Sequence, residues 1–430
     1  MKKNYLFIAL LLLSANFLNA QFTLDGEFRP RTEYRNGFGN LILADADPGF
    51  STSTRLRLNA GFKTEAYQFY ASIQDVLVWG ENRQLRPDDE NDSFALFQAW
   101  AAIDLGKGWS TKLGRQTISY DDQRIFGSVQ WVQQARNHDA ALIKYNTDKF
   151  QLDFGLAFNQ DFDNPTGFQS VGNGFFTSGF FTYKTMQYLY LKQKWNNFSG
   201  SLVLLNNGFQ NFSGDPGNVV ADGISSLQTL GTHLNYKKGS FGAAFNGFVQ
   251  TGERQGALDV KGAYLLGLDL NYKVSKAVTL GIGGEIISGN DGQTAGETGA
   301  FFPIFGTNHK FNGFLDYFYV GNHANSVGLV DLHLSGSFKL GEKSNLLVKV
   351  LNFSGQEELA SGEKSLGTEL DLVFNHNFKG GYNLKIGYSQ MFPSDGLYEL
   401  RNIAEDDAAD FQNWAWAMLT IKPKFLNTAK

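Results

Sequence analysis

The sequence contains no cysteine and is poor in proline and methionine, with 8 Pro and 4 Met in 430 residues. The lack of cysteine excludes a disulfide framework and any metal site with thiolate ligands. In an exported protein, stability would then have to come from hydrogen bonding and packing alone. We expect neither a metal ion nor a cofactor.

Long apolar segments are also missing. After residue 20, no stretch approaches the roughly 20 apolar residues that a transmembrane helix needs. Aromatic and small residues are abundant instead, with 39 Phe, 17 Tyr and 48 Gly, although the mean hydropathy is only −0.26. This combination favours either a large soluble β-protein or a membrane barrel. The length and alternation of the strands distinguish the two.

The first twenty residues have the layout of a secretory signal peptide. Lys2 and Lys3 are followed by an apolar segment, Leu6 to Leu13, that is too short to cross a bilayer, and Ala20 closes a cleavage site. We therefore expect a signal peptide over 1–20 and a single domain over 21–430. Without Lys2 and Lys3 the chain has 35 basic and 42 acidic residues, and this net charge of −7 argues against a nucleic-acid partner.

Apolar and polar residues alternate along many segments of roughly 9 to 13 residues. Leu266, Leu268 and Leu270, for example, are separated by Gly267 and Asp269. Strands of soluble proteins average about five or six residues, whereas a tilted transmembrane strand needs about 9 to 11. The apolar face, with Tyr or Phe near its ends, fits contact with lipid, and the polar face fits a water-filled lumen.

The connections between these segments alternate between short and long. The short ones are 63–66, 106–108, 146–149, 196–198, 237–240, 275–277, 341–344 and 379–381. The longer ones include 36–52, 77–93, 119–135, 161–183, 208–227, 289–328 and 392–410. Short periplasmic turns and long extracellular loops are typical of outer-membrane barrels.

The same alternation fixes the number of strands. Segment 311–321 resembles a strand, but assigning it to the preceding outer loop preserves the alternation and places both chain ends in the periplasm. The last strand is expected over 411–425. We therefore predict an all-β fold, an 18-stranded antiparallel transmembrane β-barrel, which closes so that no backbone edge meets lipid.

Basic residues are concentrated on the first predicted hairpin. Those that share one face are Arg29, Arg31 and Arg35 on the first strand and Arg55 and Arg57 on the second. We expect them to face the lumen, since an arginine facing lipid costs about 2–4 kcal/mol at mid-depth. Several guanidinium groups on one wall suit carboxylate or phosphate. The alternative is that they only keep the lumen hydrated and pair with the lumenal acids Glu285, Glu369 and Asp371.

A second basic group surrounds the polar segment 114–139. Its members are Arg115, Arg124 and Arg136. Lys112 and Leu113 fit opposite registers, which predicts a β-bulge near Gly114. The segment is too polar for a protein core and long enough to fold inward as a constriction. The alternative is a solvated surface loop.

Other polar residues give weaker signals. The acidic runs at 45–47 and 88–92 lie on expected outer loops, where they are either solvated or bind Ca²⁺; neither has EF-hand spacing. None of the six histidines forms an H-x-x-x-H or H-E-x-x-H pair. The sequence also lacks the G-x-S-x-G, Walker A and dinucleotide-binding motifs. We therefore expect that the protein is not an enzyme.

Four parts of the chain carry a family resemblance. They are the pairs Arg29/Arg31 and Arg55/Arg57, the GRQ segment 114–139, the segments 311–318 (FNGFLDYF) and 328–331 (GLVD), and the terminal residues 422–425. With these features the chain resembles the alginate-export family of outer-membrane porins, in the form found in Bacteroidetes.

The resemblance implies a monomeric 18-stranded barrel in the outer membrane of a Gram-negative bacterium. It also implies a basic lumen that conducts an anionic polyuronate. The residues matched to this lining are Arg29, Arg31, Arg55, Arg57, Arg115, Arg124 and Arg136, and Arg35 is added because it shares the face of Arg31.

The leading hypothesis is a passive channel for anionic solutes, with alginate-like polyuronates exported or taken up through it. Its expected partners are outer-membrane lipid, lipopolysaccharide and an anionic oligo- or polysaccharide. One alternative is a general, non-selective porin. Another is a plugged barrel, closed by loop 161–183 or 289–328, that acts as an outer-membrane enzyme or receptor.

Overall fold

The computed structural model describes residues 20–82, 93–159, 182–215, 220–256, 258–292, 294–319, 323 and 326–428. The expected signal peptide, apart from Ala20, lies outside the described residues, as do the acidic run 88–92 and nearly all of loop 161–183. No helix in the described ranges is long and apolar enough to cross a membrane.

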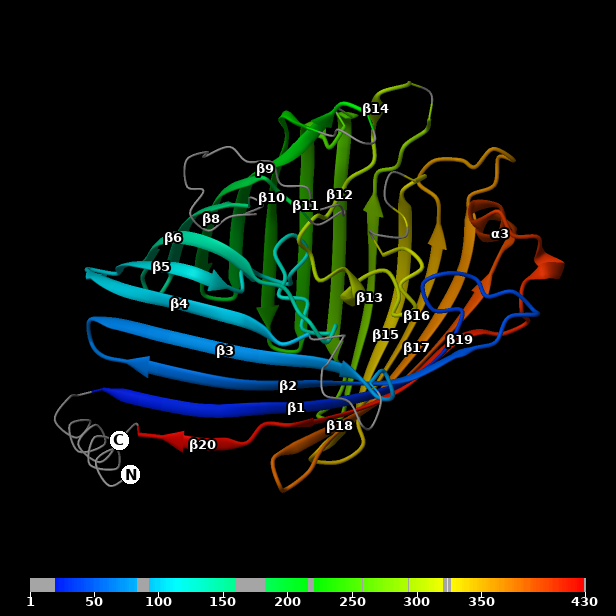
Figure 1. The fold of residues 1–430 in the computed structure, drawn as a ribbon. Coiled ribbons are helices and arrows are strands. Elements are labelled where there is room, and N and C mark those ends of the chain that lie inside the picture. Colours follow the sequence, from blue (N-terminus) through cyan, green and yellow to red (C-terminus); the bar gives the residue numbers. More distant parts are fainter. Residues whose placement is uncertain are drawn as a thin grey trace.

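Eighteen long strands form the wall of a barrel in the described part of the chain (Figure 1). They are β1 (Gln21–Asn36), β2 (Gly49–Lys63), β3 (Tyr67–Val78), β4 (Ala95–Gly106), β5 (Trp109–Gln116), β6 (His138–Asn146), β7 (Phe150–Phe158), β8 (Thr185–Trp195), β9 (Phe198–Ser213), β10 (Val220–Lys238), β11 (Phe241–Arg254), β12 (Leu258–Lys273), β13 (Val278–Ile287), β15 (Leu329–Lys339), β16 (Ser344–Ser354), β17 (Ser365–Asn377), β18 (Tyr382–Pro393) and β19 (Gln412–Ile421). The minor elements are β14 (Glu297–Thr298), β20 (Lys424–Asn427), α3 (Asp395–Arg401), η1 (Asn308–Lys310) and η2 (Glu405–Asp407).

Each wall strand pairs antiparallel with its neighbour in the chain, and β19 pairs with β1 to close the ring. The wall strands range from 8 residues in β5 to 19 in β10. Closure leaves no wall strand with a free edge, as a bilayer requires. The predicted 18-stranded barrel is confirmed, and residues 311–319 belong to a loop, as the alternation predicted.

Two expected boundaries were wrong. The last strand is not continuous: β19 ends at Ile421, and β20 begins after Pro423. Proline has no N–H to donate to the ladder, and the carbonyl of Pro423 instead accepts the N–H of Gly26 at 2.9 Å. The expected outer loop 208–227 is mostly strand, because β9 extends to Ser213 and β10 begins at Val220.

The outer face of the wall is apolar and has aromatic residues beside the short turns. Leu332 and Leu334 on β15 are both about 60% exposed. Ring pairs flank several turns, among them Trp109–Tyr145, with centroids 4.9 Å apart, and Trp195–Phe198, at 5.3 Å. Aromatic girdles of this kind mark the boundary between lipid and water. The short turns therefore lie at one edge of the membrane, and by the usual arrangement this is the periplasmic edge.

Two long connections fold into the barrel instead of outward. We call residues 117–137, between β5 and β6, the first inner segment and residues 299–319, between β13 and β15, the second. In Figure 1 they appear as a cyan and a yellow trace inside the ring of strands. They meet where Phe126 and Phe305 form an isolated parallel bridge, and the N–H of Gly127 donates to the carbonyl of Phe305 at 2.8 Å.

The inner segments change the character of the lumenal face. Phe126 and Phe305 pack against apolar side chains that project inward from the wall, such as Leu142, Leu205 and Leu265. The predicted polar lumen is therefore only part of the interior, since the inward face of β6 to β12 also forms an apolar core. The predicted inward folding of 119–135 is confirmed, and its alternative, a solvated surface loop, is excluded.

Replacing Leu334 with arginine tests which face meets lipid. We expect Leu334→Arg to lower the free energy of unfolding from vesicles by about 2–4 kcal/mol, the cost of arginine on the lipid face near mid-depth. The matched control, Ser337→Arg, places the same charge on the lumenal register of β15 and should cost much less. Equilibrium denaturant titrations measure both, and equal losses would contradict the assigned facing.

Candidate functional site

The first hairpin presents a row of arginines to the lumen. Arg29 on β1 lies opposite Arg55 on β2 in the antiparallel register, so their side chains project from the same face. Arg31 and Arg57 lie two residues further along each strand and face the same way. We call these four residues the arginine wall; each is less than a tenth exposed. Their predicted inward orientation is correct, because the alternating Phe28 and Leu56 take the lipid side.

The arginine wall binds the tip of the first inner segment, residues 130–134. Arg29 donates to the carbonyl of Gln130 at 2.6 Å and to the side-chain oxygen of Gln133 at 2.8 and 3.0 Å. Arg57 donates to the side-chain oxygen of Gln130 at 2.9 Å and to that of Gln74 at 2.8 Å. Among the described residues neither guanidinium has a carboxylate partner, so both donate only to neutral oxygens, and that of Arg57 also lies over the ring of Phe97 at 3.7 Å.

The other two arginines of the wall combine both kinds of partner. Arg55 donates through Nε to Glu27 at 2.8 Å, and it also donates to the carbonyl of Gln133 at 3.1 Å. Arg31 pairs with Glu33 at 3.0 Å, donates to the carbonyl of Trp131 at 2.9 Å and lies over its ring. The fifth arginine of this hairpin, Arg35, is 43% exposed and pairs with Glu33 at 3.1 Å. The hairpin therefore has more cations than carboxylates.

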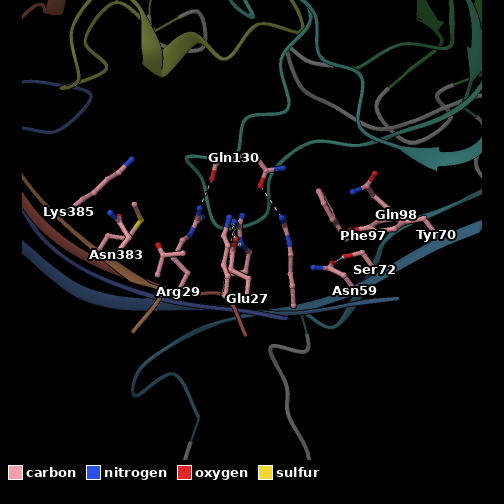
Figure 2. Close-up of a pocket in the computed structure, with 16 residues that line it drawn as sticks. Glu27, Arg29, Asn59, Tyr70, Ser72, Phe97, Gln98, Gln130, Asn383 and Lys385 are labelled. Carbon is pink, nitrogen blue, oxygen red and sulfur yellow. Dashed lines mark hydrogen bonds and ion pairs between the residues drawn. The ribbon is translucent and has the colours of Figure 1, made fainter. Parts of the chain in front are cut away.

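A cavity of about 630 Å³ lies next to the arginine wall, and Figure 2 shows its lining. Its basic lining residues are Arg29, Arg55, Arg57, Lys385 and Lys422, and Glu27 is its one acid. Lys422 pairs with Glu27 at 3.2 Å, whereas Lys385 has no carboxylate partner in the described ranges. Amide groups and the rings of Tyr70 and Phe97 complete the lining. Because Gly381, in a short turn, also lines it, the cavity extends toward the turn end of the barrel.

The second basic group does not act as one site. Arg124 is buried and donates through Nε to Glu285 on β13 at 2.9 Å. It also donates to the amide oxygens of Asn308 and Asn312 at 3.1 Å each, which ties the first inner segment to the second. Arg136 donates to the carbonyl of Gly306 at 3.3 Å, and burial lowers its pKa to about 10, so it stays charged at neutral pH.

Arg115 lies outside the lumen, contrary to the prediction that it lines the pore. Its side chain is 40% exposed and pairs with Asp139 at 2.8 Å on the outward face of β5 and β6. The expected bulge near Gly114 is also absent, since the pairing runs without a break from Lys112–Leu142 to Gln116–His138. With a continuous register, odd-numbered residues of β5 face outward, and Arg115 is one of them.

The lumenal acids do not neutralise the arginine wall. Glu369 on β17 accepts the N–H of Leu315 at 2.8 Å, and Asp371 accepts the N–H of Phe314 at 3.4 Å. Glu285 pairs with Arg124 instead of with the hairpin. These acidic side chains hold the second inner segment, so the alternative, in which they pair with the first hairpin, is wrong.

Sequence reasoning missed Lys385 and the contacts of the tip. Lys385 lies between Leu384 and Ile386, so alternation alone predicts that it faces the lumen. Its place beside Arg29 follows only once β19 closes the ring between β18 and β1. Within the described ranges, no group of three or more His, Asp and Glu residues is arranged to hold a metal ion.

Comparison with known proteins identifies both family and fold. A family model described as alginate export matches residues 21–408. OccAB4 of Acinetobacter baumannii is 14% identical with a TM-score of 0.63, covering 94% of this chain and 98% of its own. OprD of Pseudomonas aeruginosa is 12% identical with a TM-score of 0.60, covering 94% and 96%. At such identities the likeness shows the fold alone. No curated protein matches the sequence significantly.

The contact between Arg124 and Glu285 can be tested with a pair of substitutions. Arg124→Met leaves the Glu285 carboxylate buried without its partner, and we expect a loss of about 3–5 kcal/mol in unfolding free energy. The double variant Arg124→Met, Glu285→Leu removes both charges and should recover much of that loss. Denaturant unfolding measures both, and a double variant no more stable than the single one would contradict this role.

Proposed function

We propose, from the premise that this chain belongs to the alginate-export family, that it is a passive channel for anionic solutes, with alginate-like polyuronates as its cargo. The coarser part of this function is established. The chain is an integral β-barrel of the Gram-negative outer membrane, with the fold of transport channels.

One observation carries the anionic specificity. Arg29, Arg57 and Lys385 line one cavity, and none of them has a carboxylate partner among the described residues. Unpaired cations in a confined space raise the local concentration of anions and attract them from solution. Planar guanidinium groups also match the geometry of carboxylates, which a polyuronate carries on every sugar. The cavity therefore suits uronate better than a neutral sugar.

The site is complete within one chain. β1, β2 and β18 supply Arg29, Arg55, Arg57 and Lys385, and Lys422 follows the end of β19. The strands β3 and β4 supply Tyr70 and Phe97. We therefore propose that the barrel works as a monomer, surrounded by outer-membrane lipid and lipopolysaccharide. Arg124 and Arg136 serve to join the inner segments, and Arg115 takes no part in transport.

The packing of the inner segments inside the barrel supports a second candidate. Both inner segments cross the lumen and pack against the wall, as in a barrel whose loops plug it. A permanently plugged barrel would conduct nothing in a planar bilayer, whereas a channel would conduct. Current with no preference for anions would point to a general porin.

Neutralising the unpaired cations should weaken the preference for anions. We expect Arg57→Gln, Lys385→Gln to lower the ratio of anion to cation permeability by about twofold or more, because each substitution removes a charge that attracts anions. The reversal potential in a salt gradient measures this ratio, and the difference from wild type should shrink as salt rises. The matched control is Arg115→Gln, which removes a charge from the outer face. An unchanged ratio in the double variant would refute the proposed specificity.

A further inference from the structure

We infer that the tip of the first inner segment, residues 130–134, is an internal substitute for the ligand, and that carboxylate-bearing polymers open the channel by displacing it from the arginine wall. This inference rests on the proposed function and adds its regulation. The tip blocks the arginines that the cargo needs, and the cargo itself removes the block.

The chemistry of the contacts favours displacement. The arginine wall binds the tip through backbone carbonyls and the side-chain oxygens of Gln130 and Gln133, all of them neutral acceptors. Hydrogen bonds from a cation to a carboxylate are stronger than those to a neutral oxygen. Arg29 and Arg57 use only neutral partners among the described residues, so a uronate at either position exchanges a weaker contact for a stronger one.

Backbone hydrogen bonds hold the residues on both sides of the tip, which we call its base. The N–H of Arg136 donates to the carbonyl of Ser128 at 2.9 Å, which closes the base of the loop. Gly127 and Val129 donate to Phe305 and Thr307 of the second inner segment at 2.8 and 3.2 Å. Displacement of the tip therefore leaves the contact between Phe126 and Phe305 of the two inner segments in place.

Backbone strain lies on both sides of the tip. Val129 has φ 49° and Ala135 has φ 58°, both in the left-handed region. This conformation is costly for a residue with a side chain, and most of all for β-branched valine. The base holds one side of each residue and the tip contacts hold the other, so losing the tip contacts lets the backbone relax on that side. Backbone strain and the neutral acceptors therefore both favour release of the tip from the arginine wall.

Trp131 opposes displacement. Its ring stacks on His309 at 4.5 Å and meets Trp416 edge-on at 4.8 Å, and Arg31 lies over it. These ring contacts add to the hydrogen bonds from the arginine wall and keep the tip bound when no anion is present. Trp131→Ala should therefore make the channel leak a neutral sugar without any uronate.

The test follows the permeation of a neutral sugar. In a pore without a displaceable tip, bound cargo could only slow this permeation. Protein in liposomes is mixed with a small neutral sugar, and permeation is followed by swelling. We expect low concentrations of a hexauronate to raise the rate by about fivefold, the effect of about one such exchange of contacts. A neutral hexasaccharide of equal length should not raise it. In a pore without a displaceable tip, hexauronate can only slow the sugar, so the sign of the change decides.

A reversible tether provides the second measurement. Gln133 donates to Ser53 on β2 at 3.0 Å, and the chain has no native cysteine. Ser53→Cys, Gln133→Cys joined by a short reducible cross-linker should lose the hexauronate response. On reduction the response should return above a raised resting rate, because Gln133→Cys removes two hydrogen bonds from Arg29 to the tip. The control, Ser361→Cys, Glu399→Cys, joins outer-loop residues whose side chains contact each other away from the arginine wall. It should respond normally whether cross-linked or reduced.

The outcomes separate the two proposals. Anion selectivity with a hexauronate that only slows the sugar, or a response that survives the tether, would overturn the displaceable tip and leave the proposed function intact. Absence of anion selectivity would overturn the proposed function itself. A raised sugar rate that the tether abolishes supports both.

Discussion

The interior of the barrel depends on lumenal arginine and carboxyl side chains, which bind opposite ends of the peptide group. The arginine wall on β1 and β2 donates to carbonyl oxygens of the first inner segment, and carboxylates on β17 accept N–H groups of the second. Irregular backbone inside a barrel leaves both kinds of group without strand partners, and burying them unpaired is costly. Arginine and acidic residues on the lumenal register supply those partners. The same side chains that make a lumen hydrophilic therefore also hold its loops in place.

Alternation in the sequence was sufficient for the wall because lipid imposes it. Each strand must present apolar residues outward, so the inward facing of Arg29, Arg31, Arg55 and Arg57 could be predicted. The number of strands came from the alternation of short and long connections. The same rule does not constrain the lumen, where Leu142, Leu205 and Leu265 face inward to meet the inner segments. The break at Pro423 was visible in the sequence, but its effect depends on how the chain end meets β1.

The candidate site could be predicted only in part, because its partners are distant in the chain. Arg124 and Glu285 are 161 residues apart, and Arg29 and Gln133 are 104 apart. Local patterns give the facing of each residue but not which inward side chains meet across the lumen. Arg115 shows the reverse error: it lies in a segment matched to the pore lining, yet its register on β5 turns it outward.

A conduit for a charged polymer has two conflicting requirements: it must be wide enough for sugar rings, and the outer membrane must not leak through it. Lumenal arginines that bind a loop of the same barrel meet both requirements, provided that the groups they bind on the loop are weaker ligands than the cargo. Carboxylates on the tip would hold the arginines too tightly, and apolar residues would leave the guanidinium groups unpaired. Neutral oxygens lie between these extremes, since they satisfy the arginines at rest and yield to a carboxylate. The absence of Asp and Glu from residues 130–134 is therefore the feature on which the proposed opening depends.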